Sequence, residues 1–185
     1  FFFKQKTAYE IYQCDWSSDV CSSDLDGLTW LKARPWIDGA RIGIGGFSYG
    51  GFMAAYALTH STSFAAGIIG APVTDWRLYD SVYTERFMRT PAHNPEGYDR
   101  TSVVKAARQM HGRALVVHGF TDDNVHLQNT TQLLRALQQA GVDFDLMLYP
   151  GARHGITEQA QSRHYHQLTY DFLMRTLAPA GQSAR

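Results

Sequence analysis

Apolar segments of two kinds alternate along the chain from residue 26 onward. Short runs that are β-branched or continuously apolar predict four strands, at 41–45, 64–70, 114–117 and 143–149. Longer segments with helical spacing or helix-forming composition predict four helices, at 27–34, 52–60, 126–140 and 158–177. Because strands that alternate with helices form parallel sheets, the pattern predicts an α/β fold, with a mostly parallel sheet and helices on both faces.

Helix ends and one irregular stretch complete this pattern. Pro35 ends the first predicted helix and Gly141 the third, because proline cannot continue a helix and glycine tolerates a left-handed C-terminal residue. Residues 72–95 are predicted to be loop-like, yet they carry a group of aromatic side chains, namely Trp76, Tyr79, Tyr83 and Phe87. This is more aromatic surface than solvent exposure alone would favour.

The composition is that of one globular domain. With 185 residues, 44% of them apolar and 13% aromatic, the chain can form one hydrophobic core and is too apolar to be disordered. The formal net charge is zero, which argues against a nucleic-acid or membrane-surface partner. No apolar run is long enough to span a bilayer, so a transmembrane helix is not predicted.

Residues 1–25 differ from the rest of the chain. Translated back into DNA, residues 3–11 and 14–25 resemble the two ends of a common short-read sequencing adapter, in one reading frame. We therefore expect 1–25 to be translated adapter and the natural sequence to begin near Asp26, inside a longer gene. The alternative is a genuine extension rich in Ser and Asp. On the first interpretation the two cysteines, which both lie in this segment, say nothing about the redox compartment.

Residues 46–50, Gly-Phe-Ser-Tyr-Gly, match the Gly-x-Ser-x-Gly nucleophile elbow between a predicted strand and a predicted helix. In such an elbow a sharp turn lifts the serine oxygen clear of the sheet, and the flanking glycines are expected because the turn leaves no room for side chains. The backbone amide of Tyr49, at the start of the helix, is expected to stabilise an oxyanion. Chance glycine-rich turns share the pentapeptide, but the strand–turn–helix context favours Ser48 as a nucleophile.

A serine nucleophile needs a general base and a group that orients this base. In α/β-hydrolases the acid and then the histidine follow the serine, each on a loop after a later strand. The loop after 114–117 contains Asp122 and Asp123, and the loop after 143–149 contains His154. Position alone does not separate the two aspartates: one should orient His154, and the other should cap the next helix.

The remaining histidines do not suggest a competing site. Seven of them are expected to serve surface, packing or loop-shaping roles: His60, His93, His111, His118, His126, His164 and His166. Of these, His118 and His126 flank the two aspartates and are expected to shape that loop rather than to catalyse. No pair of histidines has ligand spacing on one helix and no phosphate-binding glycine loop is present, so neither a metal nor another cofactor is predicted.

Four segments together resemble the prolyl oligopeptidase family of serine peptidases, in particular its dipeptidyl-peptidase branch: 46–51, 79–86, 118–126 and 154–155. The resemblance extends over nearly all of residues 26–180. It implies the α/β-hydrolase fold, and it implies Asp122 rather than Asp123 as the triad acid. It also implies an acyl-enzyme on Ser48 and a peptide substrate from which an N-terminal X-Pro or X-Ala dipeptide is released.

The same resemblance implies a substrate pocket. Its walls for a proline ring would be Val73, Trp76, Tyr79, Tyr83 and Val125, and aromatic faces bind such a compact apolar ring at low entropic cost. Asn124 would hydrogen-bond the carbonyl of the residue before the proline. Without the resemblance, Tyr79 and Tyr83 would be interpreted as ordinary core packing at a spacing of four residues.

Several parts that the family requires are absent from these residues. They are an upstream tyrosine hydroxyl for the oxyanion hole, the first strands of the sheet, and a β-propeller whose paired glutamates hold the substrate's amino group. We therefore expect 26–185 to be the C-terminal part of a peptidase catalytic domain and to be inactive alone. The resemblance allows a homodimer of the full-length protein and export to a periplasm or the cell exterior, but these residues determine neither.

Other functions stay open at this point. They are an oligopeptidase or acylaminoacyl peptidase of the same family, an esterase on the same fold, and a catalytically silent binding module. Residues 122–126 argue against the esterase. The presence of Ser48, Asp122 and His154 together argues against the silent module, which has no chemical need for all three.

Overall fold

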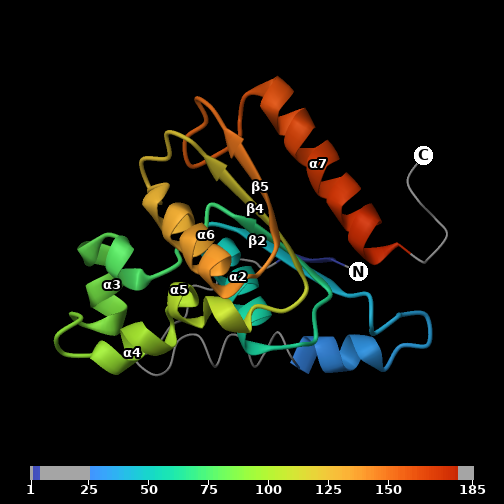
Figure 1. Ribbon diagram of the computed structural model, residues 1–185, viewed down its shortest axis with the longest axis horizontal. Helices are drawn as coiled ribbons and strands as arrows, with labels where there is room; N and C mark the ends of the chain where they lie inside the picture. The colour runs from blue at the N-terminus through green and yellow to red at the C-terminus, as the bar shows by residue number, and fades with distance from the viewer. Residues whose placement is uncertain (1, 5–25, 179–185) are drawn as a thin grey trace.

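The computed structural model describes residues 2–4 and 26–178 (Figure 1). Within these residues one sheet has the strand order β1-β2-β3-β4-β5, and every neighbouring pair is parallel. The strands are β1 (Phe2–Lys4), β2 (Gly43–Phe47), β3 (Ala66–Gly70), β4 (Arg113–Gly119) and β5 (Phe144–Tyr149). The predicted α/β fold with a parallel sheet is confirmed, although β2 lies two residues later than expected.

Strand β1 lies within the segment that we expect to be adapter-derived. Its three residues pair with residues 43–45 along the edge of β2. Such pairing uses backbone groups, so an open edge can accept an extended segment of almost any sequence. Residues 5–25, with both cysteines, lie outside the described residues.

Four helices occupy the predicted positions. They are the helix at 26–32, α2 (Tyr49–His60), α6 (Gln128–Ala140) and α7 (Gln159–Leu177). Gly141 ends α6 in the left-handed conformation, with φ 68°, as its position after the helix predicted. Within the described residues, none of the helices is both long and apolar enough to cross a membrane.

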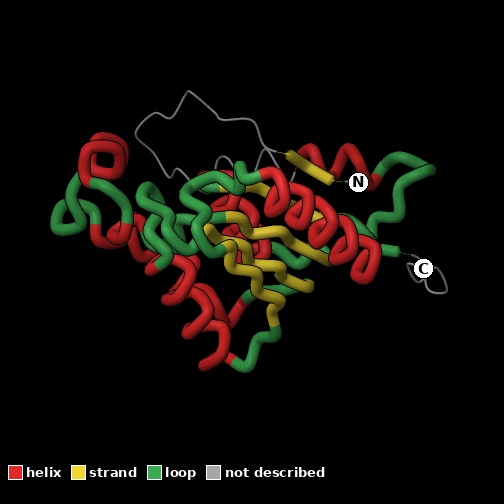
Figure 2. Tube along the Cα trace, turned by 90° about the horizontal axis from the view of Figure 1, so that it is seen from above, coloured by secondary structure: helices red, strands yellow, loops and turns green. Residues whose placement is uncertain are grey.

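The helices cover both faces of the sheet, as Figures 1 and 2 show. Alternate strand residues point to opposite sides. Ile69 and Val116 belong to the cluster that contains the apolar residues of α2 and α6. Ile68 and Leu115 belong to the second cluster, which contains Phe172 of α7. The central strands are therefore buried on both faces, which explains their continuous apolar runs.

The expectation of a loop over 72–95 is wrong. This part of the chain forms two short helices, η1 (Trp76–Leu78) and α3 (Ser81–Met88). Three more follow it: α4 (Pro95–Arg100), α5 (Val103–Ala106) and η2 (Ala107–Gln109). Asp75, Asp80, Asn94 and Ser102 each accept a hydrogen bond from a backbone N–H of the helix that follows. Such caps satisfy the unpaired amides at a helix start, so local capping stabilises helices that lack a long apolar stripe.

Candidate active site

Ser48 is the single residue between strand β2 and helix α2. Its backbone has φ 61° and ψ −119°, a conformation that residues other than glycine rarely adopt. Two hydrogen bonds hold it there: the N–H of Ser48 donates to the carbonyl of Gly70 at 2.8 Å, and the N–H of Phe52 donates to the carbonyl of Ser48 at 3.0 Å. Strain of this kind persists where the surroundings enforce it, and it is common at functional sites.

The glycines around Ser48 have different roles. A Cβ on Gly46 would lie 2.3 Å from the carbonyl oxygen of Gly50, so Gly46 has no room for a side chain. A Cβ on Gly50 would meet nothing within 4 Å, so the expectation that both flanking glycines lack room is wrong for Gly50. The second crowded position is Gly51, whose Cβ would lie 2.2 Å from the carbonyl oxygen of Gly70. Helix α2 therefore packs against β3 backbone to backbone.

Substitution at Gly51 is expected to be costly, and substitution at Gly50 is not. In the intact protein, Gly51→Ala should lower the free energy of unfolding by about 1–3 kcal/mol, because the new methyl group forces α2 away from β3. Gly50→Ala is the matched control and should leave stability unchanged or slightly higher, since alanine is favoured in a helix. Urea unfolding of both variants checks this, and equal midpoints would contradict the packing argument.

His154 joins Ser48 to Asp122 in one hydrogen-bonded chain. Its Nε2 lies 2.8 Å from the Oγ of Ser48, and its Nδ1 lies 2.8 Å from the Oδ2 of Asp122. A carboxylate can only accept, so Nδ1 carries the hydrogen and Nε2 is left to accept from the serine hydroxyl. The carboxylate of Asp122 is fully buried, whereas 24% of the His154 side chain is exposed. The arrangement can deprotonate Ser48 and store the proton on His154.

The two aspartates that position alone could not separate have different surroundings. Asp122 Oδ1 accepts from the backbone N–H groups of Asn124 at 2.9 Å and Val125 at 3.0 Å, so its carboxylate turns inward. Asp123 forms an exposed ion pair with Arg153 at 3.4 Å. The expectation that one aspartate caps the next helix is wrong, because α6 begins later, after Leu127, without a side-chain cap.

The loop that carries Asp122 and the loop that carries His154 are bonded to each other. The N–H of Phe120 donates to the carbonyl of Tyr149 at 2.9 Å, and the N–H of Thr121 donates to the carbonyl of Ala152 at 3.0 Å. Gly119 permits this approach, because a Cβ there would lie 2.1 Å from the carbonyl oxygen of Arg153. The separation between acid and base is thus determined by backbone contacts.

The sequence predicts no role for Phe47, and for His118 it predicts only a loop-shaping role. The ring of Phe47 packs against the ring of His154, with centroids 5.7 Å apart at 60°. His118, expected only to shape the loop, is fully buried and lies 3.1 Å from Asp122 Oδ2. Phe47 is the variable residue of the serine motif and carries no chemical signal in the sequence. His118 lies in β4, just before the loop of Asp122, and its position in the sequence does not show that its ring reaches the carboxylate.

The residues that the family resemblance implied for a substrate pocket form an aromatic cluster. The rings of Trp76 and Tyr83 stack at 25° with centroids 6.1 Å apart, and those of Tyr79 and Tyr83 meet edge-on at 5.6 Å. Val73, Trp76 and Val125 are buried, whereas Tyr83 is 36% exposed. The cluster therefore combines a buried base with aromatic surface that remains open to solvent.

Tyr79 also links this cluster to the loop of Asp122. Its hydroxyl donates to the Oδ1 of Asn124 at 2.8 Å. Burial raises the pKa of Tyr79, and the charges of Asp80 and Asp122 raise it further, so the phenol keeps its proton at neutral pH. With its oxygen occupied by Tyr79, the carboxamide of Asn124 keeps its NH₂ group as the donor for another partner.

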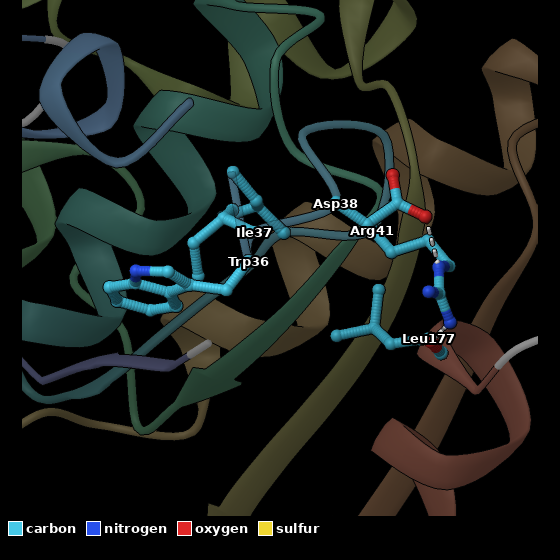
Figure 3. A pocket seen from close by; sticks show the side chains of 6 residues that line it. Trp36, Ile37, Asp38, Arg41 and Leu177 are labelled. Atoms are coloured by element: carbon cyan, nitrogen blue, oxygen red, sulfur yellow. Dashed lines mark hydrogen bonds and ion pairs between the residues drawn. The ribbon is translucent and has the colours of Figure 1, made fainter. Parts of the chain in front are cut away.

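A separate pocket of about 210 Å³ lies at the other end of β2 (Figure 3). It is lined by Trp36, Ile37, Asp38, Arg41, Ile42 and Leu177. Within it, Arg41 donates to Asp38 at 2.6 Å and to the carbonyl of Leu177 at 3.2 Å. Apart from Leu177, the residues that line it precede β2 in the chain, whereas Ser48 follows β2. The pocket therefore contains none of the predicted site residues. Over residues 2–4 and 26–178, no group of three His, Cys, Asp or Glu side chains could hold a metal ion.

Comparisons with known proteins agree with this geometry. The family model described as "Prolyl oligopeptidase family" matches residues 9–180. A dipeptidyl-aminopeptidase B from Aspergillus niger is 47% identical over 151 residues, which cover 80% of this chain and 16% of that protein. The crystal structure of Porphyromonas gingivalis dipeptidyl peptidase 4 is similar with a TM-score of 0.84 and 43% identity, over 90% of this chain and 24% of that chain. The chain thus spans less than a fifth of the length of that curated fungal relative.

Proposed function

This chain belongs to the prolyl oligopeptidase family, and from that premise we propose that it supplies the catalytic residues of a serine peptidase that releases N-terminal dipeptides. The observation that carries the proposal is the hydrogen-bonded chain from Ser48 through His154 to the buried Asp122. The dipeptidyl specificity is supported by the similar proteins, which are named dipeptidyl-aminopeptidase B and dipeptidyl peptidase 4.

The reaction begins with acylation. The Oγ of Ser48 attacks the carbonyl carbon of the second peptide bond of the substrate, and its proton passes to Nε2 of His154. Asp122 stabilises the resulting imidazolium through Nδ1–H. His154 then gives the proton to the leaving amine, the C–N bond breaks, and the dipeptide remains as an ester on Ser48.

Water completes the cycle. It loses a proton to His154 as it attacks the ester, and the proton then returns to Ser48 when the dipeptide leaves. In both steps negative charge develops on the substrate oxygen. Tyr49 is the first residue of α2, so its backbone N–H lies at the positive end of a helix immediately after Ser48, where it can stabilise that oxyanion.

The aromatic cluster provides the recognition of the substrate. A proline ring binds against Tyr79 and Tyr83, because flat aromatic faces bury a compact ring without losing many rotamers. The ring of Trp76 contacts both tyrosines and forms, with Val73 and Val125, the buried base of this wall. The NH₂ group of Asn124 donates to the carbonyl of the residue before the proline. Tyr79 has a double role here, since it contributes a wall and orients Asn124.

Removal of the Tyr79 hydroxyl is expected to weaken substrate binding. Tyr79→Phe keeps the ring but frees the carboxamide of Asn124 to rotate, so kcat/KM should fall about fivefold, the equivalent of one hydrogen bond of about 1 kcal/mol. The loss should come mainly from a higher KM. Tyr170→Phe, on the exposed face of α7, is the matched control. An unchanged KM in Tyr79→Phe would show that this hydrogen bond does not orient Asn124 toward the substrate.

The proposed function is tested with the intact protein of which this chain is a part. A fluorophosphonate should label Ser48 stoichiometrically, and Gly-Pro-p-nitroanilide should be hydrolysed much faster than its N-acetylated form. Absence of labelling would overturn the hydrolase proposal and favour a silent binding module. Labelling with a preference for the acetylated substrate would instead favour an acylaminoacyl peptidase.

A further inference from the structure

Two imidazole rings share one oxygen of Asp122. His154 Nδ1 lies 2.8 Å from Asp122 Oδ2, and His118 Nε2 lies 3.1 Å from the same atom. The side chains of His118 and Asp122 are both fully buried. A second buried histidine on the acid of a triad is not needed for the proton transfers described above, so its contacts call for a physical explanation.

The contacts of His118 determine which of its nitrogens carries the hydrogen. Nε2 lies near two oxygens that can only accept, Asp122 Oδ2 and the carbonyl of Val125, which is 2.8 Å away. Nε2 must therefore be the donor, and both oxygens share its hydrogen. Nδ1 lies 2.7 Å from the hydroxyl of Thr130, a buried residue of α6. A neutral ring accepts from that hydroxyl, which leaves no polar atom of His118 without a partner.

Burial keeps His118 in this neutral form. It lowers the pKa of His118, while the hydrogen bonds to Val125 and Asp122 act in the opposite direction. The other titratable group that faces the ring is His154, which further disfavours a positive charge on it. His118 is thus a neutral N–H donor to the carboxylate, not a second cation that neutralises it.

This donor completes the hydrogen bonding of the Asp122 carboxylate. Oδ1 accepts two backbone N–H groups, from Asn124 and Val125, and Oδ2 accepts two imidazole N–H groups. Any rotation of the carboxylate would break bonds at both oxygens.

We propose that His118 is a positioning residue for the reaction, which holds the carboxylate of Asp122 in the orientation that His154 needs. The inference rests on the proposed function, since it concerns the same proton transfer. Without the Nε2–H donor, Oδ2 of Asp122 would lose one of its two imidazole partners, and the carboxylate could turn away from His154. Proton transfer from Ser48 would then be slower, so kcat would fall while KM stayed near its wild-type value.

Three variants of the intact protein, with a fourth in reserve, separate this role from mere packing. His118→Asn is too short to reach Asp122 but can still accept from Thr130. His118→Gln can still place an N–H near Asp122. Thr130→Val removes the link to α6 but leaves both acceptors of Nε2 in place. His118→Leu, which is also without a donor, serves if the Asn variant does not fold.

The separate values of kcat and KM for Gly-Pro-p-nitroanilide decide the matter. His118→Asn should lower kcat about tenfold, the equivalent of one lost hydrogen bond to a charged group, and should leave KM unchanged. His118→Gln should restore most of kcat, and Thr130→Val should lower the unfolding temperature and leave kcat unchanged. If His118→Asn or His118→Leu folds and only loses stability, as Thr130→Val does, the inference is wrong. An inactive wild-type protein would overturn the proposed function itself, and this inference with it.

The stability of the protein provides a readout that does not depend on activity. Because the pKa of His118 is lowered in the folded state, its neutral form favours folding above the ordinary histidine value, and this contribution is lost as the pH falls below about 6.5. Wild-type protein should therefore lose stability on acidification faster than His118→Gln, which cannot titrate. Parallel stability curves between pH 8 and pH 5 would show that His118 is not the neutral buried donor.

Discussion

Replacement of Ser48 by alanine is expected to reduce kcat by about six orders of magnitude in the intact protein. The reason is that His154 Nε2 lies 2.8 Å from Ser48 Oγ, and alanine leaves the base with nothing to deprotonate. The backbone strain is unchanged, since serine at φ 61° already pays the steric cost of a Cβ. Folding and substrate binding should therefore remain close to those of the wild type.

Three measurements on the same preparations check this result. Turnover of Gly-Pro-p-nitroanilide should vanish in Ser48→Ala, fluorophosphonate should no longer attach, and the unfolding temperature should stay within a few degrees. Ser162→Ala, a half-buried serine on α7, is the matched control and should behave as wild type. Residual turnover of a few per cent in Ser48→Ala would mean that another group is the nucleophile, and the proposed mechanism would have to be abandoned.

Much of the sheet was predictable, and the shift at β2 has a local cause. The strand predicted at 41–45, with a glycine as its boundary, lies at Gly43–Phe47 in the structure. In the structure Gly46 continues it and accommodates the backbone of Gly50 from α2. Glycine lowers the propensity of a segment to form a strand, but the close approach of a helix to a strand requires it. Which of these two roles a glycine has is determined by the tertiary structure, and not by the local sequence.

The region between β3 and β4 was less predictable for a different reason. Helices α3 and α4 are short and lack a periodic apolar stripe, so their stability comes from caps and from distant partners. The ring of Trp76, which is buried, lies edge-on to that of Phe52 with centroids 5.1 Å apart. Tyr98 is also buried, and its hydroxyl donates to the carbonyl of Arg89 at 2.7 Å. Such contacts between separate elements leave no trace in local hydrophobic spacing.

At the candidate site, too, some features follow from the local sequence and others depend on the tertiary structure. The positions of Ser48 and His154 follow from a motif and from chain order, which the sequence contains directly. The direction in which an aspartate side chain points depends on the turn that its own backbone makes. Asp122 turns inward because two following amides bind its Oδ1, and Asp123, one residue later, faces Arg153. Sequence position narrows the acid to two residues, the family resemblance implies Asp122, and the geometry of the loop supports that choice.

Asp122→Asn is therefore expected to have the second largest effect, a loss of about four orders of magnitude in kcat. The carboxamide fits the same space, but it cannot accept at both ends. If its oxygen accepts from Asn124 and Val125, its NH₂ group meets the N–H donors of His154 and His118. His154 must then adopt the other tautomer, in which Nε2 carries the hydrogen and cannot take a proton from Ser48.

Asp123→Asn is the matched control for this change. It removes only the exposed ion pair with Arg153, and such pairs contribute roughly 0.2–1 kcal/mol, so kcat should stay within about a factor of two. Measured side by side on the intact protein, the kcat values of the two variants should differ by a factor of several thousand, while their unfolding temperatures stay similar. Equal losses in both would mean that the loop as a whole, and not the inward carboxylate of Asp122, supports His154. A larger loss in Asp123→Asn would transfer the role of the acid to Asp123.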